Sequence, residues 1–133
     1  MKNTLKLLIP LFVAPLLIGC RTPVVFSASM KYELGSVRKS SSTSFYYSAN
    51  SADGSMTAHI NIKSGQSLDL KASYTVELGA LTVSILDKDK NELYDEIIVD
   101  NKESVYALND YGNYDVKIEI DEFRGNLSFS WAK

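Results

Sequence analysis

Apolar and polar residues alternate with a period of two along most of the chain after residue 45. Met56, Ala58, Ile60 and Ile62, for example, each follow a polar neighbour, which is the pattern of a strand with one buried face. The same alternation recurs over residues 68–76 and 81–85, and further strand segments are predicted over residues 93–99, 104–108, 114–120 and 127–131. Helical periodicity is nearly absent from this part of the chain. The pattern therefore predicts an all-β fold.

Turn signals separate these predicted strands. They stand at Asp53-Gly54, Ser64-Gly65, Leu78-Gly79, Asp87 to Asn91, Asp100-Asn101, Tyr111-Gly112 and Arg124-Gly125. This spacing is typical of sandwiches and barrels. Because each sheet has one apolar face to cover, we predict a two-layer antiparallel β-sandwich, immunoglobulin-like or jelly-roll-like, of about seven to nine strands.

Composition narrows the chemistry that the domain can perform. The chain has 133 residues, of which 45% are hydrophobic and 23% charged, as expected for one folded domain. A single Cys excludes an intramolecular disulfide, and one Cys with one His is too few for a zinc site built from these residues. A domain of this size buries enough surface to be stable without either. We expect no cofactor.

The N-terminus has the layout of a secretory signal. Lys2 and Lys6 precede an apolar run over residues 7–19, and Arg21 follows soon after it. The run is shorter than the roughly 20 apolar residues that a membrane-spanning helix needs. We therefore interpret the segment as an export signal.

The end of this run, Leu17-Ile18-Gly19-Cys20, resembles the lipobox of bacterial lipoproteins at all four positions. The resemblance implies that a peptidase cuts between Gly19 and Cys20 and that Cys20 carries a diacylglycerol and further acyl chains such as palmitate. Membrane lipid would then be the first partner of the chain. The protein would be extracytoplasmic and anchored in the cell membrane or an outer membrane.

The predicted organisation has three parts: a signal peptide over residues 1–19, a tether over residues 20–29 that starts with the lipidated Cys20, and a β-sandwich domain over residues 30–133. Pro23 and small polar residues favour the tether. A serine-rich stretch, Ser36 to Ser44, is predicted to be a mobile surface loop.

The charge of the chain argues against nucleic-acid binding. Without Lys2 and Lys6 the chain has 12 basic and 16 acidic residues, a balance of −4, and no basic stripe. Phosphate backbones and anionic lipid head groups repel such a surface. We predict that attachment to a membrane comes from the lipid alone.

Two resemblances concern the sandwich itself. Asp110 to Val116 resembles the tyrosine corner of immunoglobulin-like domains, which implies that the Tyr114 hydroxyl bonds back to the loop backbone. Residues 65–131 resemble the small sandwich domains at the C-terminal ends of secreted bacterial peptidases, through Ile85-Leu86-Asp87 and Gly112-x-Tyr114-x-Val116-x-Ile118. That second resemblance implies a non-catalytic binding or accessory role.

A weak calcium motif lies in the predicted turn after residue 86. Asp87, Asp89 and Asn91 present oxygen atoms at alternate positions, as a calcium loop does. The sixth position is Glu92 rather than Gly, and the twelfth is Ile98 rather than Glu. A solvated hairpin turn is therefore favoured over a metal site.

Candidate catalytic groups are few. His59 falls on the polar face of a predicted strand, where we expect it to be exposed and unpaired, and no Gly-x-Ser-x-Gly sequence is present. The carboxylates interpreted as ordinary outward positions are those of Asp95, Glu96, Glu119, Asp121 and Glu122. We predict that the protein is not an enzyme, and a surface hydrolase is the alternative.

Aromatic residues raise a second alternative, a glycan-binding module. The chain has eight Tyr, and aromatic faces stack on sugars. Tyr74, Tyr114 and Trp131 fall on apolar faces and are predicted to be core, and one of the adjacent Tyr46 and Tyr47 should face outward. The remaining candidates for binding are Tyr47, Tyr94, Tyr106 and Tyr111.

Together these patterns predict a lipid-anchored, non-catalytic binding or structural module of the bacterial cell envelope. Its partner would be an envelope protein or a glycan.

Overall fold

The computed structural model describes residues 24–131, and seven strands account for most of them. The strands are β1 (Val24–Leu34), β2 (Val37–Ser40), β3 (Ser44–Ile62), β4 (Leu68–Leu86), β5 (Glu92–Ile98), β6 (Lys102–Leu108) and β7 (Gly112–Ser130). The described range contains no helix, and hence none that could span a membrane. The prediction of an all-β domain is confirmed.

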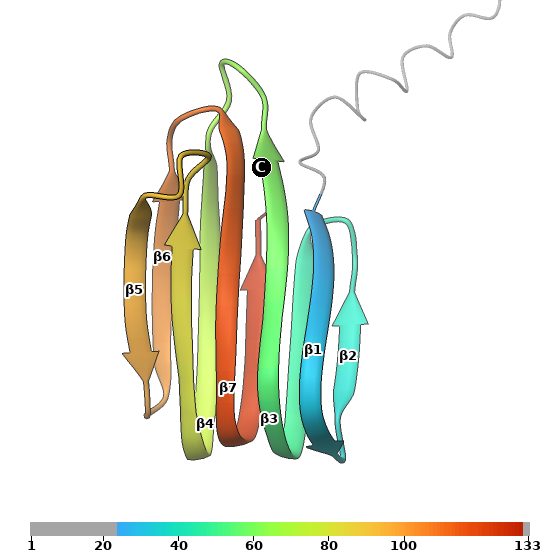
Figure 1. The fold of residues 1–133 in the computed structure, drawn as a ribbon. Helices are drawn as coiled ribbons and strands as arrows, with labels where there is room; N and C mark the ends of the chain where they lie inside the picture. The colour runs from blue at the N-terminus through green and yellow to red at the C-terminus, as the bar shows by residue number, and fades with distance from the viewer. Residues whose placement is uncertain (1–23, 132–133) are drawn as a thin grey trace, which may run out of the picture.

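The strands form two facing layers. The pairing order is β1-β3-β7-β4-β5, β2 pairs with β3, β6 pairs with β4, and every pairing is antiparallel. Figure 1 shows that β3, β4 and β7 each fold back on themselves at one end of the molecule, which we call the bend end. The predicted two-layer antiparallel β-sandwich is therefore confirmed, with three long strands shared between its layers.

Each layer contains five strand segments. The front layer consists of β1, β5, the second halves of β3 and β4, and the first half of β7. The back layer consists of β2, β6, the first halves of β3 and β4, and the second half of β7. The turns that join β3 to β4, β4 to β5 and β6 to β7 lie at the opposite end, which we call the loop end (Figure 1).

Three of the predicted turns are bends inside strands, so their interpretation as strand ends was wrong. Gly54, Gly79 and Gly125 lie within β3, β4 and β7, at the points where the ladders shift register. A Cβ on Gly79 or Gly125 would overlap the backbone carbonyl of the neighbouring strand. Their φ angles of +77° and +146° also disfavour other residues. Glycine here lets a strand bend where another residue would end it.

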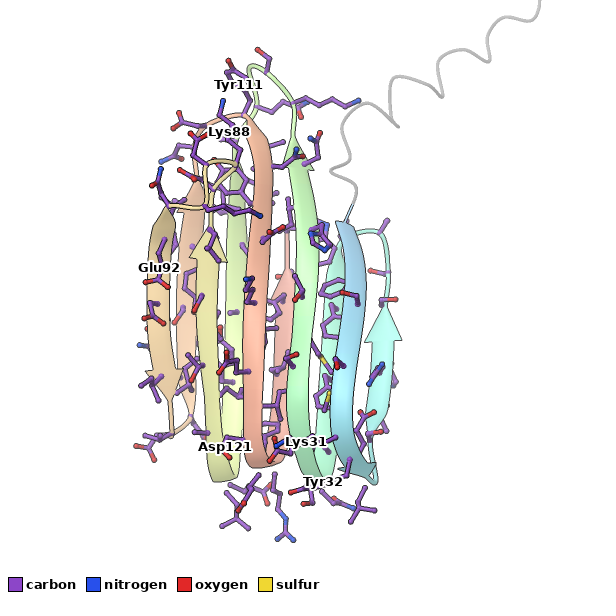
Figure 2. All side chains as sticks on the ribbon, viewed as in Figure 1. Lys31, Tyr32, Lys88, Glu92, Tyr111 and Asp121 are labelled. Carbon is purple, nitrogen blue, oxygen red and sulfur yellow. The ribbon has the colours of Figure 1, made fainter. Side chains whose placement is uncertain are left out.

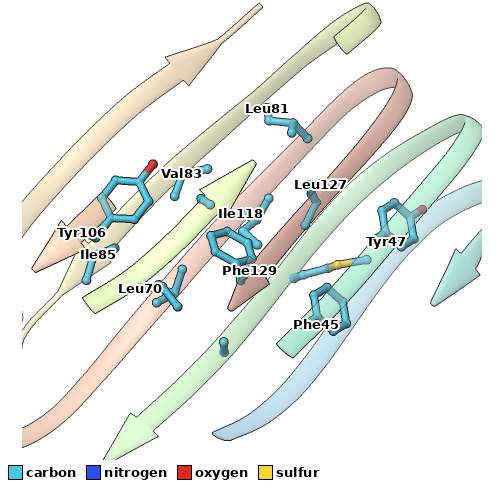
Figure 3. Close-up of a cluster of buried hydrophobic side chains, with 14 of the residues drawn as sticks. Phe45, Tyr47, Leu70, Leu81, Val83, Ile85, Tyr106, Ile118, Leu127 and Phe129 are labelled. Atoms are coloured by element: carbon cyan, nitrogen blue, oxygen red, sulfur yellow. The ribbon is translucent and has the colours of Figure 1, made fainter. Parts of the chain in front are cut away.

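The alternating apolar positions form one continuous core between the layers. Figure 3 shows a cluster of these side chains, with Phe129, Ile118 and Leu127 on β7 among side chains from several other strands. Tyr74, Tyr114 and Trp131 are buried, as predicted. Period-two alternation was a reliable signal here because each half-strand has one face in the core and one in solvent.

The N-terminal boundary of the domain differs from the prediction. Residues 24–29, which we expected in the tether, belong to β1 and pair with β3 from Val24 opposite Ile60 onward. Residues 37–40, expected in a loop, form β2. Both are edge strands, and from residue 26 onward their side chains are exposed or half-buried, so neither carries a strong alternation. Cys20 and Gly19 lie outside the described residues, and their lipidation and cleavage stay predictions.

The predicted tyrosine corner is present. The Tyr114 hydroxyl donates a hydrogen bond of 2.7 Å to the backbone carbonyl of Asp110. Burial raises the pKa of Tyr114, so the hydroxyl keeps its proton for this bond. This hydrogen bond holds the start of β7 against the β6–β7 loop that precedes it.

We expect Tyr114→Phe to destabilise the domain by about 0.5 to 1.5 kcal/mol, because the ring stays and one buried hydrogen bond is lost. The fall in the urea midpoint measures this effect. Tyr46→Phe is the control, because the half-buried Tyr46 hydroxyl has no hydrogen-bond partner among residues 24–131. An equal midpoint for the wild-type chain and Tyr114→Phe would contradict a stabilising corner.

Candidate functional site

Two turns at the loop end enclose a cavity of about 260 Å³, which we call the loop-end cavity. One is the β4–β5 hairpin over residues 87–91, and the other is the β6–β7 turn over residues 109–111. Its lining residues are Asp87, Lys88, Asp89, Leu93, Asp110, Tyr111, Asn113 and Tyr114. The cavity therefore combines carboxylates, an amide, a lysine and aromatic rings.

Tyr111 is the exposed aromatic residue of this cavity. Its exposed fraction is 58%, and the Lys88 ammonium lies 5.3 Å from the ring centroid. Figure 2 shows Tyr111 and Lys88 together at the loop end, with Tyr32 at the opposite end of the molecule. Among the described residues, these two tyrosines are the exposed aromatic side chains. Of these two exposed tyrosines, Tyr111 is the one that lines the loop-end cavity.

The hairpin beside Tyr111 is held by Asp87. Its Oδ1 accepts hydrogen bonds of 2.9 Å from the backbone N–H groups of Asp89 and Asn91, and its Oδ2 accepts one of 3.3 Å from the Asn91 side chain. The bond from the Asn91 backbone is the main reason that the pKa of Asp87 is lowered. The predicted hairpin turn is confirmed. The Asp87 carboxylate of the weak calcium motif is already engaged by the turn's own donors.

A second hollow, of about 410 Å³, adjoins the loop-end cavity and shares Asn113 and Tyr114 with it. It also contains His59, whose Nδ1 lies 2.7 Å from the Asp115 carboxylate. Lys90 donates to the same carboxylate at 3.0 Å. Although partial burial opposes it, these two partners lower the pKa of Asp115. The two hollows therefore form one polar surface around the loop end.

The expectation that His59 is unpaired was wrong, although it is exposed as predicted. Antiparallel pairing of β3 and β7 places His59 directly opposite Asp115. The two residues lie far apart in the sequence, so their pairing follows from the register between strands, which the local pattern does not reveal. No Ser, Thr or Cys among residues 24–131 is hydrogen-bonded to His59. The pair therefore lacks the nucleophile that a triad would need.

The carboxylates considered for hydrolysis lie elsewhere. Glu119 and Asp121 line a shallow groove of about 610 Å³ on the outer face of the front layer. Carboxylate oxygens of Asp53, Asp121 and Glu122 come within 4.8 Å of one another near the bend. Asp121 and Glu122 are exposed there, without the apolar surroundings that keep a catalytic acid protonated. None of these groups lines the loop-end cavity.

Glu96 does not point outward as predicted, and Tyr106 is buried rather than available for binding. Glu96 on β5 accepts a 2.6 Å hydrogen bond from the Tyr106 hydroxyl on β6 and pairs with Lys102. Lys102 and Tyr106 lower the pKa of Glu96, while burial and this contact raise the pKa of Tyr106 to about 12. Tyr74 extends the chain with a 2.9 Å bond to Tyr106. The group closes one edge of the sandwich.

The opposite edge is closed in the same way, and this removes Tyr47 from the binding candidates. The Tyr47 hydroxyl on β3 donates to Glu33 on β1 at 2.8 Å, and Arg38 on β2 donates to Glu33 at 2.8 Å. Burial and the Glu33 carboxylate raise the pKa of Tyr47. Tyr46 is the less buried of the adjacent pair, as predicted. A carboxylate, a tyrosine and a cation thus join the layers at both edges.

Tyr94, the last aromatic candidate, is half-buried against β6. Its hydroxyl donates to the Ala107 carbonyl and accepts from the Ala107 N–H, both at 3.1 Å. It therefore satisfies backbone groups of an edge strand. Of the four candidate tyrosines, the structure leaves Tyr111 exposed at a cavity.

No protein-family model matches the sequence, and no curated protein matches it. Among solved structures, TmCBM61 in complex with β-1,4-galactotriose is 11% identical, with 84% of this chain and 88% of that one covered at a TM-score of 0.48. The carbohydrate-binding module CBM6cm-2 from Cellvibrio mixtus lichenase 5A, in complex with cellotriose, is 11% identical, with 80% and 92% covered at 0.39.

A third similar structure is the enzymatically active domain of bacteriophage CBA120 tailspike protein 4, which is 18% identical at a TM-score of 0.40. The match covers 84% of this chain and spans 18% of the tailspike chain. Because these sequence identities and TM-scores are low, the similar structures do not identify a ligand for this chain, and its own surface has to indicate one.

Proposed function

We propose that the protein is a lipid-anchored, non-catalytic glycan-binding module of the cell envelope, with the sugar held at the loop-end cavity. The observation that carries this proposal is the exposed ring of Tyr111 at the rim of a cavity lined by carboxylates and an amide. The anchor is the lipid on Cys20 that the lipobox implies.

The ring of Tyr111 supplies the apolar contact that a sugar needs. Pyranose rings have apolar C–H faces, and an aromatic ring with two rigid χ angles binds such a face at low entropic cost. The Lys88 ammonium lies 5.3 Å from the ring centroid, and this cation–π contact favours the observed position of the ring. A stacked sugar would therefore lie over the cavity beside residues 87–91.

The remaining lining supplies hydrogen bonds for sugar hydroxyls. The Asp89 and Asp110 carboxylates are acceptors, and the Asn113 side chain both donates and accepts. Asn113 is itself held by a 2.6 Å bond from Asn61, so part of this polar surface is preorganised. A few oriented polar groups around one aromatic contact are typical of a small-ligand site.

The non-catalytic part of the proposal rests on the arrangement of the reactive groups. His59 and Asp115 adjoin the cavity but have no hydrogen-bonded nucleophile within residues 24–131. The exposed carboxylates of the front layer lie on a different surface. We expect binding without turnover.

A binding measurement tests this function. The full chain, purified in detergent, is screened against soluble mannan, galactan, xylan and chitin oligosaccharides and peptidoglycan fragments, and the tightest binder is titrated by calorimetry. Tyr111→Ala should weaken binding about tenfold or more, since losing the stacking ring costs about 1.4 kcal/mol or more. Tyr32→Ala, at the bend end, is the control and should bind like the wild-type chain.

Two results would overturn the proposal. One is a panel in which no glycan binds, and the other is a glycan that binds equally to the wild-type chain and to Tyr111→Ala. Release of shorter sugars during the titration would contradict the non-catalytic part.

A further inference from the structure

The loop-end cavity carries an excess of negative charge. Its charged lining residues are Asp87, Lys88, Asp89 and Asp110. Three carboxylates and one ammonium leave a balance of −2 in this small space. In the adjoining hollow, Asp115 is already engaged by Lys90 and His59. The uncompensated negative charge therefore belongs to the loop-end cavity itself.

Two of the cavity carboxylates are open to a ligand. Asp87 holds the hairpin turn, whereas Asp89 and Asp110 are exposed, and their carboxylates have no hydrogen bond or ion pair within residues 24–131. The backbone of both residues is nevertheless fixed. Asp89 donates its N–H to Asp87, and Asp110 accepts the Tyr114 hydroxyl at its carbonyl. Each carboxylate is thus carried on an ordered turn.

The two turns direct negative charge toward the same point. Asp89 lies on the β4–β5 hairpin and Asp110 on the β6–β7 turn, and both line the cavity between these turns. Burial raises the pKa of Tyr114, and the charges of Asp110 and Asp87, one from each turn, add to that effect. A ligand in the cavity therefore meets carboxylates from both sides.

The aromatic ring of the cavity already contacts a cation. The Lys88 ammonium lies 5.3 Å from the Tyr111 ring centroid, and Figure 2 shows the two side chains together. Lys88 forms no ion pair within the described part of the chain, so it does not neutralise one particular aspartate. An aromatic face beside open carboxylates is the surrounding that an ammonium group prefers.

We propose that the loop-end cavity binds an amino sugar with a free, protonated amino group, whose ammonium lies between the Asp89 and Asp110 carboxylates while its ring stacks on Tyr111. This inference rests on the proposed glycan binding and names the class of sugar. An ammonium has three N–H donors, enough for both carboxylates. The cavity volume of about 260 Å³ is below the roughly 300 Å³ at which pockets for drug-sized ligands begin, so it suits one sugar residue.

The same charges disfavour the other common sugars. A uronic acid would place its carboxylate beside those of Asp89 and Asp110, and like charges in contact oppose binding. An N-acetylated sugar is neutral, because the amide has replaced the ammonium. It keeps the stacking contact with Tyr111 but forms no charge-assisted hydrogen bond. Acetylation of one nitrogen should therefore change the affinity.

Matched oligosaccharides test the proposal with the full chain in non-ionic detergent. A glucosamine tetrasaccharide and its fully N-acetylated counterpart are titrated by calorimetry at about pH 6, where the sugar amine is protonated. An exposed ion pair strengthens binding about two- to fivefold, so two pairs should make the amine form bind about tenfold tighter. Oligogalacturonate should bind weakest. Peptidoglycan disaccharides with and without the acetyl groups show whether that backbone can carry the amine as well.

Variants locate the preference at the cavity. Asp89→Asn and Asp110→Asn should each weaken binding of the glucosamine tetrasaccharide about two- to fivefold and leave binding of the acetylated form unchanged. Asp121→Asn removes the same charge at the bend end, which Figure 2 shows far from Tyr111, and should bind both forms like the wild-type chain. Tyr111→Ala should weaken binding of both forms.

Two results would overturn the amino-sugar assignment. One is an acetylated or acidic oligosaccharide that binds at least as tightly as the glucosamine form. The other is an equal loss in Asp121→Asn and in the two cavity variants, which would assign the preference to the net charge of the chain. In either case, binding that still depends on Tyr111 would leave the proposed glycan site standing. Failure of every glycan to bind would remove both proposals.

Discussion

Gly125→Ala is expected to cost about 3 kcal/mol or more of the free energy of unfolding, the largest stability effect that the structure indicates. A Cβ at this position would overlap the Thr75 carbonyl, which belongs to the backbone of the neighbouring β4 and cannot rotate away. The φ angle of +146° adds a conformational cost for any other residue. Urea unfolding followed by circular dichroism measures the loss.

Gly65→Ala separates the steric overlap from the conformational cost of a positive φ angle. Gly65 also has a positive φ angle, +83°, but no atom lies within 4 Å of the position that a Cβ would take. Its substitution should therefore cost only the conformational penalty, about 1 kcal/mol. If both alanine variants lost the same stability, the close approach of β4 and β7 at Gly125 would not explain the glycine.

Cys20→Ala is expected to abolish stable membrane attachment, because it removes the only thiol in the chain. Two or more acyl chains hold a protein on a bilayer, whereas the acidic surface of this chain offers no electrostatic substitute. The lipobox resemblance also predicts that an unlipidated precursor escapes cleavage after Gly19. The variant should therefore keep its signal segment.

Mass spectrometry of membrane-extracted protein checks this prediction directly. The wild-type chain should begin at Cys20 and carry the added mass of the acyl chains, and Arg21→Ala should behave in the same way. A wild-type N-terminus upstream of Cys20, or a Cys20 peptide without acyl mass, would sink the lipoprotein assignment.

The sequence predicts the fold class well because burial in a sandwich has a short period. The alternation of Tyr114, Val116, Ile118 and Ile120 reports directly on the face of β7 that meets the core. The corner bond from Tyr114 to Asp110 is also local, with both partners four residues apart. Such features depend on neighbours along the chain and are readable without a structure.

The sequence predicts the candidate site poorly because its geometry depends on which strands are neighbours. His59 meets Asp115 only through the register of β3 and β7. Tyr47 and Tyr106 are buried because a carboxylate from the other layer receives each hydroxyl. Tyr111 could be identified as a candidate because a tyrosine beside Gly112 in a turn has no core position to occupy. The residues that line the cavity opposite Tyr111 could not be identified from the sequence, because they come from a different turn.

The bends were misread for a related reason. Asp53-Gly54 and Arg124-Gly125 have the composition of turns between strands, and the local sequence of a turn is the same as that of a sharp bend. Only the pairing of both halves of β3 and β7 with the same neighbouring strands reveals continuous strands.

The start of β1 fixes how an anchored protein would stand on a membrane. β1 begins at Val24 on the side of the molecule that carries the loop end (Figure 1), and Cys20 precedes it by four residues. A chain of that length spans at most about 14 Å. The lipid would therefore hold the Tyr111 turn toward the bilayer and the bends of β3, β4 and β7 away from it. If the proposed anchor and sugar site are both correct, a long polymer would have to approach sideways, and short or lipid-linked saccharides in the head-group layer would be the expected ligands.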